Sequence, residues 1–171
     1  MGPVVAEEAT SFSELLAGYG TTAIGEAVTV ESVFALLKVR DEDGDPAWVV
    51  RSGGSALPPE ELLGTLDGLT ASMRDRLTRA WTRQPPAPPA AGDPPARIQF
   101  SELLAGLDTM GVGNEYVIES VFAVIKARRD DGAAAWHVRS SEMKLGPEER
   151  LGALEGYAAT LRQQLAGTWR W

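Results

Sequence analysis

His137 is the only histidine in the chain, and histidine is the side chain best suited to move protons near neutral pH. A catalytic histidine needs an orienting partner and a pocket, and the neighbouring sequence supplies only scattered acidic residues. The chain also contains no cysteine, which excludes disulfides, thiolate metal sites and cysteine nucleophiles. We therefore expect no catalytic residue and interpret His137 as a surface residue of a strand.

Two glycine-containing motifs resemble ligand sites but lack essential parts. Residues 41–45 read Asp-Glu-Asp-Gly-Asp, as a calcium loop would, yet the glycine stands fourth in the loop instead of sixth. The loop glycines lack the Gly-Lys-Ser/Thr sequence of a phosphate loop; they are Gly18, Gly20, Gly25, Gly111 and Gly113. Turn geometry explains both motifs, so we expect neither a metal nor a cofactor.

Charged residues on otherwise apolar segments are the remaining candidates for chemistry. They are Glu31, Lys38 and Arg51, and later in the chain Glu119, Lys126 and Arg139. Cross-strand ion pairs are the simpler interpretation. The alternative is a small-molecule pocket, whose polar lining would be Glu31, Arg51, Glu119, Arg139 and His137.

One sequence occurs twice in the chain. Phe-Ser-Glu-Leu-Leu-Ala-Gly begins at residue 12 and again at residue 100, an offset of 88. The same offset relates Glu-Ser-Val-Phe-Ala at 31 and at 119. About half of the positions are identical between residues 12–83 and 100–171, and no gap is needed. We infer a tandem duplication.

The duplication sets the expected domain organisation. Residues 1–11 are predicted to be a flexible N-terminus, 12–83 repeat 1, 84–97 a linker and 98–171 repeat 2. Paired prolines favour an extended linker of about 40 Å. Each repeat is marginally small for folding alone. We therefore predict one joint domain in which a pseudo-twofold axis relates the repeats, as in a fused homodimer.

Each repeat is predicted to form a short helix, a β-hairpin and a long helix. Acidic-Gly turns between runs of Val, Ile, Phe and Trp indicate the hairpins, and proline followed by two glutamates is typical of a helix start. The expected elements are short helices at 13–17 and 101–105, first hairpin strands at 28–40 and 116–128, and long helices beginning at Pro59 and Pro147. The fold class is α+β, with an antiparallel sheet of four or more strands and both long helices on one face.

A turn centred on Asp43 and Gly44 would place Val39 opposite Trp48. One sheet face is then continuously apolar around Val33 and Leu37, and we expect it to carry the long helices. The other face mixes apolar and charged residues, namely Val30, Phe34, Leu36, Lys38, Val49 and Arg51 with their equivalents Ile118, Phe122, Val124, Lys126, His137 and Arg139. Either the short helices or a partner protein would cover it.

Glycines and tryptophans add two expectations. Gly64 with Gly68, and Gly152 with Gly156, are predicted to form a close-packed seam, since glycine inside a helix otherwise costs about 1 kcal/mol. Trp81 and the C-terminal tryptophans are packing anchors in the simplest interpretation, although tryptophan is also typical of binding hot spots. The candidate partner-binding residues are Phe34, Leu36, Phe122, Val124, Trp169 and Trp171.

Composition narrows the classes of function. With 44% hydrophobic and 23% charged positions among 171 residues, the chain is typical of a globular protein. A net charge of −8 opposes binding to nucleic acids and to anionic membranes. The N-terminus lacks the features of a signal peptide, and the abundance of Ala, Gly, Pro and Arg suggests a GC-rich bacterial gene, so we expect a cytoplasmic bacterial protein.

These observations favour a non-enzymatic protein-interaction module, which would be an adaptor, a scaffold or a chaperone-like protein. Its partner would be another protein or a second copy of itself, with no nucleic acid and no membrane. The alternative is a small-molecule sensor or an enzyme with a pocket at the junction of the repeats.

Overall fold

The computed structural model describes residues 8–25, 27–55, 57–82, 96–141 and 146–168. The chain forms two compact units. The first combines residues 1–56 with 94–144, and the second combines 57–93 with 145–171. Each unit therefore draws on both repeats.

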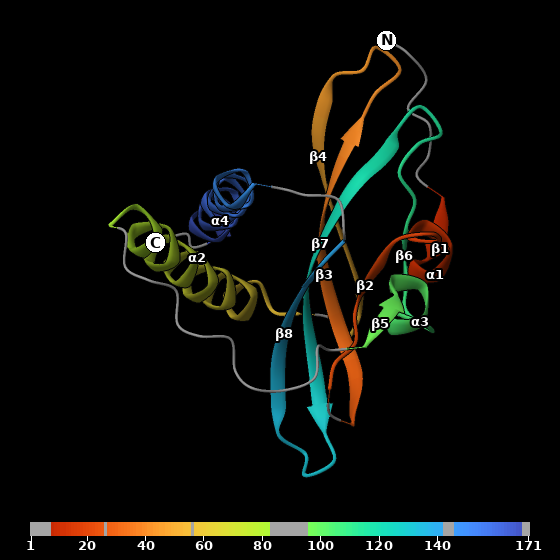
Figure 1. The fold of residues 1–171 in the computed structure, drawn as a ribbon, viewed down its shortest axis with the longest axis horizontal. Helices are drawn as coiled ribbons and strands as arrows, with labels where there is room; N and C mark the ends of the chain where they lie inside the picture. Colours follow the sequence, from red (N-terminus) through yellow and green to blue (C-terminus); the bar gives the residue numbers. More distant parts are fainter. Residues whose placement is uncertain (1–7, 26, 56, 83–95, 142–145, 169–171) are drawn as a thin grey trace. The chain divides into compact units, whose positions relative to one another are not determined.

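The first unit contains a four-stranded antiparallel sheet (Figure 1). Across the sheet the strands are β4 (Pro46–Gly54), β3 (Val28–Arg40), β7 (Val117–Arg129) and β8 (Ala134–Ser140). The strands are rich in β-branched and aromatic residues, which suit a pleated surface. The predicted hairpins and the α+β class are confirmed.

Four short strands in the first unit were not expected from the sequence. β1 (Ala9–Ser11) pairs with β6 (Asp108–Met110), and β2 (Gly20–Thr22) pairs with β5 (Arg97–Gln99), both antiparallel. Three residues are too few to show the alternation of a strand, so the sequence gives no sign of them. β1 falls within the range expected to be flexible and β5 begins within the expected linker, while residues 1–7 and 84–95 lie outside the described residues.

A short helix follows β1 and another follows β5. They are α1 (Phe12–Leu15) and α3 (Phe100–Leu103), each beginning one residue earlier than expected. The Ser11 hydroxyl caps α1 by accepting the backbone N–H of Glu14 at 3.2 Å. Gly18 and Gly106 follow the helices with φ of +90° and +84°, which glycine adopts without strain.

The hairpin register differs by one residue from the expected one. Lys38, not Val39, lies opposite Trp48, and Leu37 lies opposite Val49. The turn closes when the backbone N–H of Asp41 bonds the Asp45 carbonyl at 3.1 Å, so it centres on residue 43. A one-residue slip moves every side chain of β4 to the other face of the sheet.

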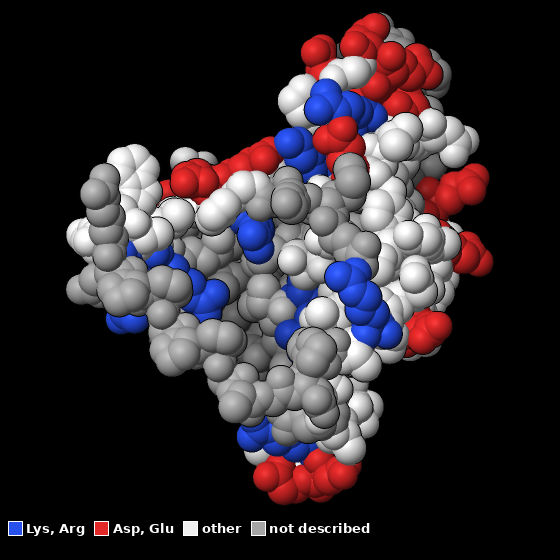
Figure 2. Space-filling model, viewed as in Figure 1, with Lys and Arg blue, Asp and Glu red and all other residues white. Residues whose placement is uncertain are grey.

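The slip recurs in the second hairpin and changes the composition of both faces. Lys126 lies opposite Trp136, and Ile125 lies opposite His137. The slip moves four residues from the expected mixed face to the other one, namely Val49, Arg51, His137 and Arg139. Val30 and Ile118 lie on that other face too, because the β3–β7 register shifts beside them. Figure 2 shows acidic side chains at both hairpin ends, where Glu42, Asp43, Asp130 and Asp131 are exposed.

The short helices pack on the face that was expected to carry the long helices. Phe12 and Leu16 from one helix segment and Phe100 and Leu104 from the other are fully buried in one apolar cluster. The strand residues of this cluster are Val33, Ala35, Leu37, Val39, Val121, Ala123 and Ile125. The expectation that short helices cover the opposite face is therefore wrong. Both faces carry apolar residues, so alternation alone could not assign the helices to one of them.

The second unit consists of α2 (Pro59–Trp81) and α4 (Pro147–Thr168), which lie side by side. Both helices begin at the predicted proline. Asp67 contacts Arg162 and Arg74 contacts Glu155, so the helices run antiparallel. Within the described part of the chain, no helix is both long and apolar enough to cross a bilayer.

The helix glycines do not form the expected close-packed seam. A Cβ atom built on Gly64, Gly68, Gly152 or Gly156 would meet no atom within 4 Å. All four glycines are exposed on the helix surfaces. The prediction of a seam at these positions is wrong, and the cost of a helical glycine is not offset by tight packing.

Replacement of Gly64 by alanine should therefore stabilise the protein. We expect Gly64→Ala to raise the free energy of unfolding by about 1 kcal/mol, because alanine has the higher helix propensity and open space for its methyl group. Urea denaturation measures the change. Gly54→Ala is the matched control and should destabilise, since Gly54 has φ of +82° and its Cβ would lie 2.1 Å from the Glu31 carbonyl oxygen. Equal effects of the two substitutions would contradict this account.

Candidate functional site

Glu31 and Glu119 occupy irregular positions in the central strand pair. The β3–β7 register shifts between Val30 and Ser32, and again between Lys38 and Val39. At the first shift Glu31 is the extra residue of β3, and at the second Glu119 is the extra residue of β7. A β-bulge re-aims the side chain of the extra residue. The side chains of the two glutamates therefore do not follow the alternation between the two sheet faces that the other residues of β3 and β7 show.

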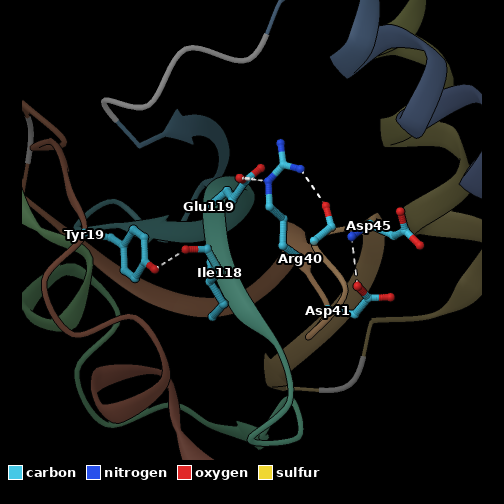
Figure 3. Close-up of polar contacts among 7 residues, drawn as sticks. Tyr19, Arg40, Asp41, Asp45, Ile118 and Glu119 are labelled. Atoms are coloured by element: carbon cyan, nitrogen blue, oxygen red, sulfur yellow. Dashed lines mark hydrogen bonds and ion pairs between the residues drawn. The ribbon is translucent and has the colours of Figure 1, made fainter.

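Each glutamate forms an ion pair with an arginine of the neighbouring strand. Arg128 Nε donates to Glu31 Oε1, and Arg40 Nε donates to Glu119 Oε1. Figure 3 shows Arg40 reaching both Glu119 and the hairpin turn, where its Nη1 donates to the Gly44 carbonyl at 2.7 Å. Arg128 bonds the Gly132 carbonyl in the same way at 2.9 Å. Each arginine therefore ties a hairpin turn to the other repeat.

The Arg128 guanidinium lowers the pKa of the Glu31 carboxyl from its ordinary value of 4.5. The hydrogen bond from Arg128 is the main cause, and the positive charges of Arg128 and Lys126 add to it. The same hydrogen bond raises the pKa of Arg128. Both groups therefore keep their charges across the range in which proteins are usually handled.

Arg51 and Arg139 bind backbone carbonyl groups. Arg51 on β4 donates from Nε to Met110 at 3.0 Å and from Nη2 to Gly111 at 2.9 Å. Arg139 on β8 donates from Nε to Thr22 at 3.0 Å and from Nη2 to Ala23 at 3.2 Å. Each arginine thus holds the segment that follows a short strand of the other repeat.

Two threonine hydroxyls reinforce these contacts. Thr109 Oγ1 donates to the Ser52 carbonyl at 3.0 Å, and Thr21 Oγ1 donates to the Ser140 carbonyl at 2.9 Å. We call the contact of β4 with β6 seam A and the contact of β8 with β2 seam B. Arg51 and Thr109 belong to seam A, and Arg139 and Thr21 belong to seam B.

The polar residues of the expected pocket are thus engaged in separate contacts. Glu31 and Glu119 contact arginines, and Arg51 and Arg139 hold backbone groups in two different seams. His137 is half-buried opposite Ile125 on the face that carries the short helices. Among the described residues, no three His, Cys, Asp or Glu side chains gather as a metal site requires.

The apolar candidates for partner binding are buried. Phe34, Leu36, Phe122 and Val124 are each at most 2% exposed. They therefore do not form an exposed apolar patch. Trp169 and Trp171 lie outside the described residues.

Trp81 is not the packing anchor that its position suggested. It ends α2 with 79% of its surface exposed. Arg76 and Arg79 on the same helix segment are exposed as well. Arg79 forms an ion pair with Asp75 at 3.0 Å, so this helix end combines a large aromatic side chain with charges of both signs.

The second unit contains a groove between α2 and α4 with a volume of about 200 Å³. Its lining residues are Asp67, Thr70, Arg74, Glu155, Ala158 and Arg162. The charged side chains pair across it, Asp67 with Arg162 and Arg74 with Glu155. These four charged residues, like Arg40 and Arg128, were not predicted from the sequence as candidates, although charge is retained at equivalent positions of both repeats.

The Glu31 ion pair should make stability depend on acid. Because the folded state lowers the pKa of Glu31, its stabilisation is complete above the ordinary value of 4.5 and is lost as pH falls through the lower value of the folded state. We expect Glu31→Gln to reduce stability near neutral pH, and the difference from the parent protein to shrink as pH falls below 4.5. Urea denaturation across this range measures the difference. In an Arg128→Gln background the effect of the substitution should be much smaller, because only the charge of Lys126 then remains, and an undiminished effect would contradict the pairing.

Phe122→Asp should unfold the protein, because it places a carboxylate at a buried apolar position. The expected loss is about 4 kcal/mol or more, a large share of ordinary domain stability. Thermal melting followed by circular dichroism measures it. Val117→Asp on the same strand is the control, since Val117 is 66% exposed. A folded Phe122→Asp variant would show that the burial of this face is not required for folding.

Comparisons with known proteins provide no further assignment. The chain matches no family model, no curated protein and no solved structure. Its function is therefore argued from the contacts described above.

Proposed function

We propose that the chain is an intramolecular dimer of two copies of one unit and that it acts as a non-enzymatic protein-interaction module. A twofold interface is isologous, which means that residue i of one copy contacts residue j of the other and the converse also holds. The reciprocity of the contacts between the repeats is the observation that carries the proposal.

Reciprocal contacts occur in both units when positions are compared at an offset of 88. Glu31 with Arg128 corresponds to Glu119 with Arg40. In the second unit, Asp67 with Arg162 corresponds to Glu155 with Arg74. Seams A and B correspond in the same way, hydroxyl for hydroxyl and guanidinium for guanidinium. The pairings of β1 with β6 and of β2 with β5 are equivalent too.

Backbone hydrogen bonds follow the same rule. The N–H of Phe12 bonds the Leu107 carbonyl and the N–H of Phe100 bonds the Tyr19 carbonyl, both at 2.9 Å. A chance resemblance between two segments would not reproduce partner, atom and distance together. These bonds support a duplicated unit with pseudo-twofold symmetry.

The use of the charged residues favours a non-enzymatic role. Glu31, Arg51, Glu119 and Arg139 would have lined the pocket of a sensor or an enzyme. Each of them instead joins the two repeats. Charges retained in both repeats are thereby explained by assembly, without a substrate.

Trp81 supports the assignment to protein binding. Tryptophan and arginine are enriched at binding hot spots, and a tryptophan that is 79% exposed leaves a large apolar surface in water. Arg76 and Arg79 would form a polar rim around it. We therefore propose that the end of α2 binds a protein with an apolar pocket bordered by polar residues.

Among the described residues, the groove between α2 and α4 favours the alternative, a small-molecule sensor. It lies between helices of the two repeats, where a shared ligand site was expected. With about 200 Å³ it is smaller than the usual range for ligand pockets, which begins near 300 Å³. Native mass spectrometry of protein purified gently from its own host separates the two functions, since a protein adduct and a small-molecule adduct differ in mass.

Trp81→Ala tests the protein-binding surface. Once the partner is identified by its mass, we expect this variant to bind it at least about tenfold more weakly, as for a hot-spot residue. The melting temperature should stay near that of the parent, because the side chain is exposed. Val117→Thr, which alters an exposed apolar residue of the first unit, is the control for binding. Unchanged affinity of Trp81→Ala, or purification without any protein adduct, would contradict the proposal.

A further inference from the structure

Seams A and B share equivalent threonines and arginines, but they differ in the residues at the end of the outer strand. In seam A, β4 ends in Gly53 and Gly54. The corresponding residues that follow β8 in the sequence are Ser141 and Glu142. The two repeats therefore differ where the outer strand of one meets the short strand of the other.

Gly53 is the residue that seam A requires. A Cβ atom at this position would lie 2.3 Å from the backbone oxygen of Asp108 on β6 and 2.6 Å from a ring carbon of Phe12. The first of these atoms belongs to the backbone and the second to a fully buried ring, so neither can move away easily to make room for a side chain. The approach of β4 to β6 depends on the missing side chain.

Gly54 adds a second requirement. Its φ of +82° lies in the left-handed region, and a Cβ atom would lie 2.1 Å from the Glu31 carbonyl oxygen. Repeat 2 has a glutamate at the corresponding position. The strand end of repeat 2 could not adopt this conformation without strain.

Seam B instead accommodates a side chain. Ser141 is buried, with 8% of its surface exposed, and its hydroxyl accepts the backbone N–H of Val121 at 3.0 Å. The short strand in this seam begins with Gly20, where β6 in seam A begins with Asp108. In seam B, Ser141 of the outer strand end is combined with Gly20 of the short strand. In seam A, Gly53 is combined with Asp108.

Tyr19 supplies a bond that repeat 2 cannot return. Its hydroxyl donates to the Ile118 carbonyl (Figure 3). The corresponding residue of repeat 2 is Leu107, which has no hydroxyl. Two copies of repeat 2 placed together would lack this bond on both sides.

We infer that the interface has diverged so that repeat 2 pairs with repeat 1 and not with another repeat 2. A pair of second repeats would place Ser141 where the contact geometry of seam A requires glycine. Because each second repeat then needs a first repeat, mass action favours the mixed pair even where two first repeats could associate. This selectivity rests on the proposed intramolecular dimer, and its consequence is that the second repeats of two different chains do not pair with each other.

A cut chain tests the selectivity. A protease recognition sequence is inserted between Pro89 and Ala90 of the full chain, the protein is cleaved and unfolded in denaturant, and the fragments are refolded together. Native mass spectrometry distinguishes the possible pairs, because the two fragments differ in mass. We expect the mixed pair to dominate and pairs of second repeats to be undetectable. A statistical mixture of all pairs would overturn the selectivity, whereas fragments that separate after cleavage under native conditions would overturn the intramolecular dimer itself.

Substitutions in the uncut chain give a second measurement that needs no refolding. Gly53→Ser places in repeat 1 the residue that repeat 2 carries, and we expect the melting temperature to fall by about 5 °C or more. Ser141→Gly is the matched control and should cost less, because it removes one hydrogen bond and introduces no overlap. A Gly53→Ser variant as stable as the parent would overturn the inference.

Discussion

The pairing of β3 with β7 is the interaction on which the first unit depends. It joins residues of the two repeats along nearly the full length of both strands and gives the sheet its central pair. The bulges at Glu31 and Glu119 lie inside this pairing, and they aim the two glutamates at arginines of the neighbouring strand. Since those arginines also bind the hairpin turns, the register of the centre controls the position of both hairpin ends.

The same pairing explains why neither repeat is expected to be self-sufficient. Repeat 1 alone would have only β3 and β4 of the large sheet, and a two-stranded hairpin is marginally stable in water. Its short strands β1 and β2 would have no partners, because β6 and β5 belong to the later part of the chain. The apolar cluster would also lose the aromatic ring of Phe100. The extensive sharing of strands is typical of an obligate dimer.

Much of the fold could be predicted from the sequence, because long elements carry periodic patterns. The hairpins and the starts of α2 and α4 followed from alternation, turn residues and proline at the first helical turn. The register could not be fixed, since a five-residue acidic turn allows two centres and only the bond from Asp41 to Asp45 selects one. β1, β2, β5 and β6 could not be found, because three residues carry no period.

The sequence identified several of the residues that make important contacts, but not the contacts that they make. The sequence identified Arg51 and Arg139 as retained charges, and their backbone acceptors became visible only when the short strands had been located. The exposed surface of Trp81 could not be predicted either, because a tryptophan at a helix end serves packing as readily as binding. For Phe34 and Phe122 the pattern indicated apolar strand positions but could not show whether that face is covered.

The proposed fusion of two copies would give the dimer a freedom that a homodimer lacks. In a homodimer every substitution occurs twice across the axis, so a glycine required at one seam is imposed on both. In one chain, Gly53 serves seam A while Ser141 serves seam B with a hydrogen bond of its own. The same freedom extends to residues outside the seams, where Val49 stands in one repeat and His137 in the other. Such asymmetry allows the residues that hold the repeats together and the residues that bind a partner to change independently. The end of α2 can keep a binding surface while the end of α4 changes.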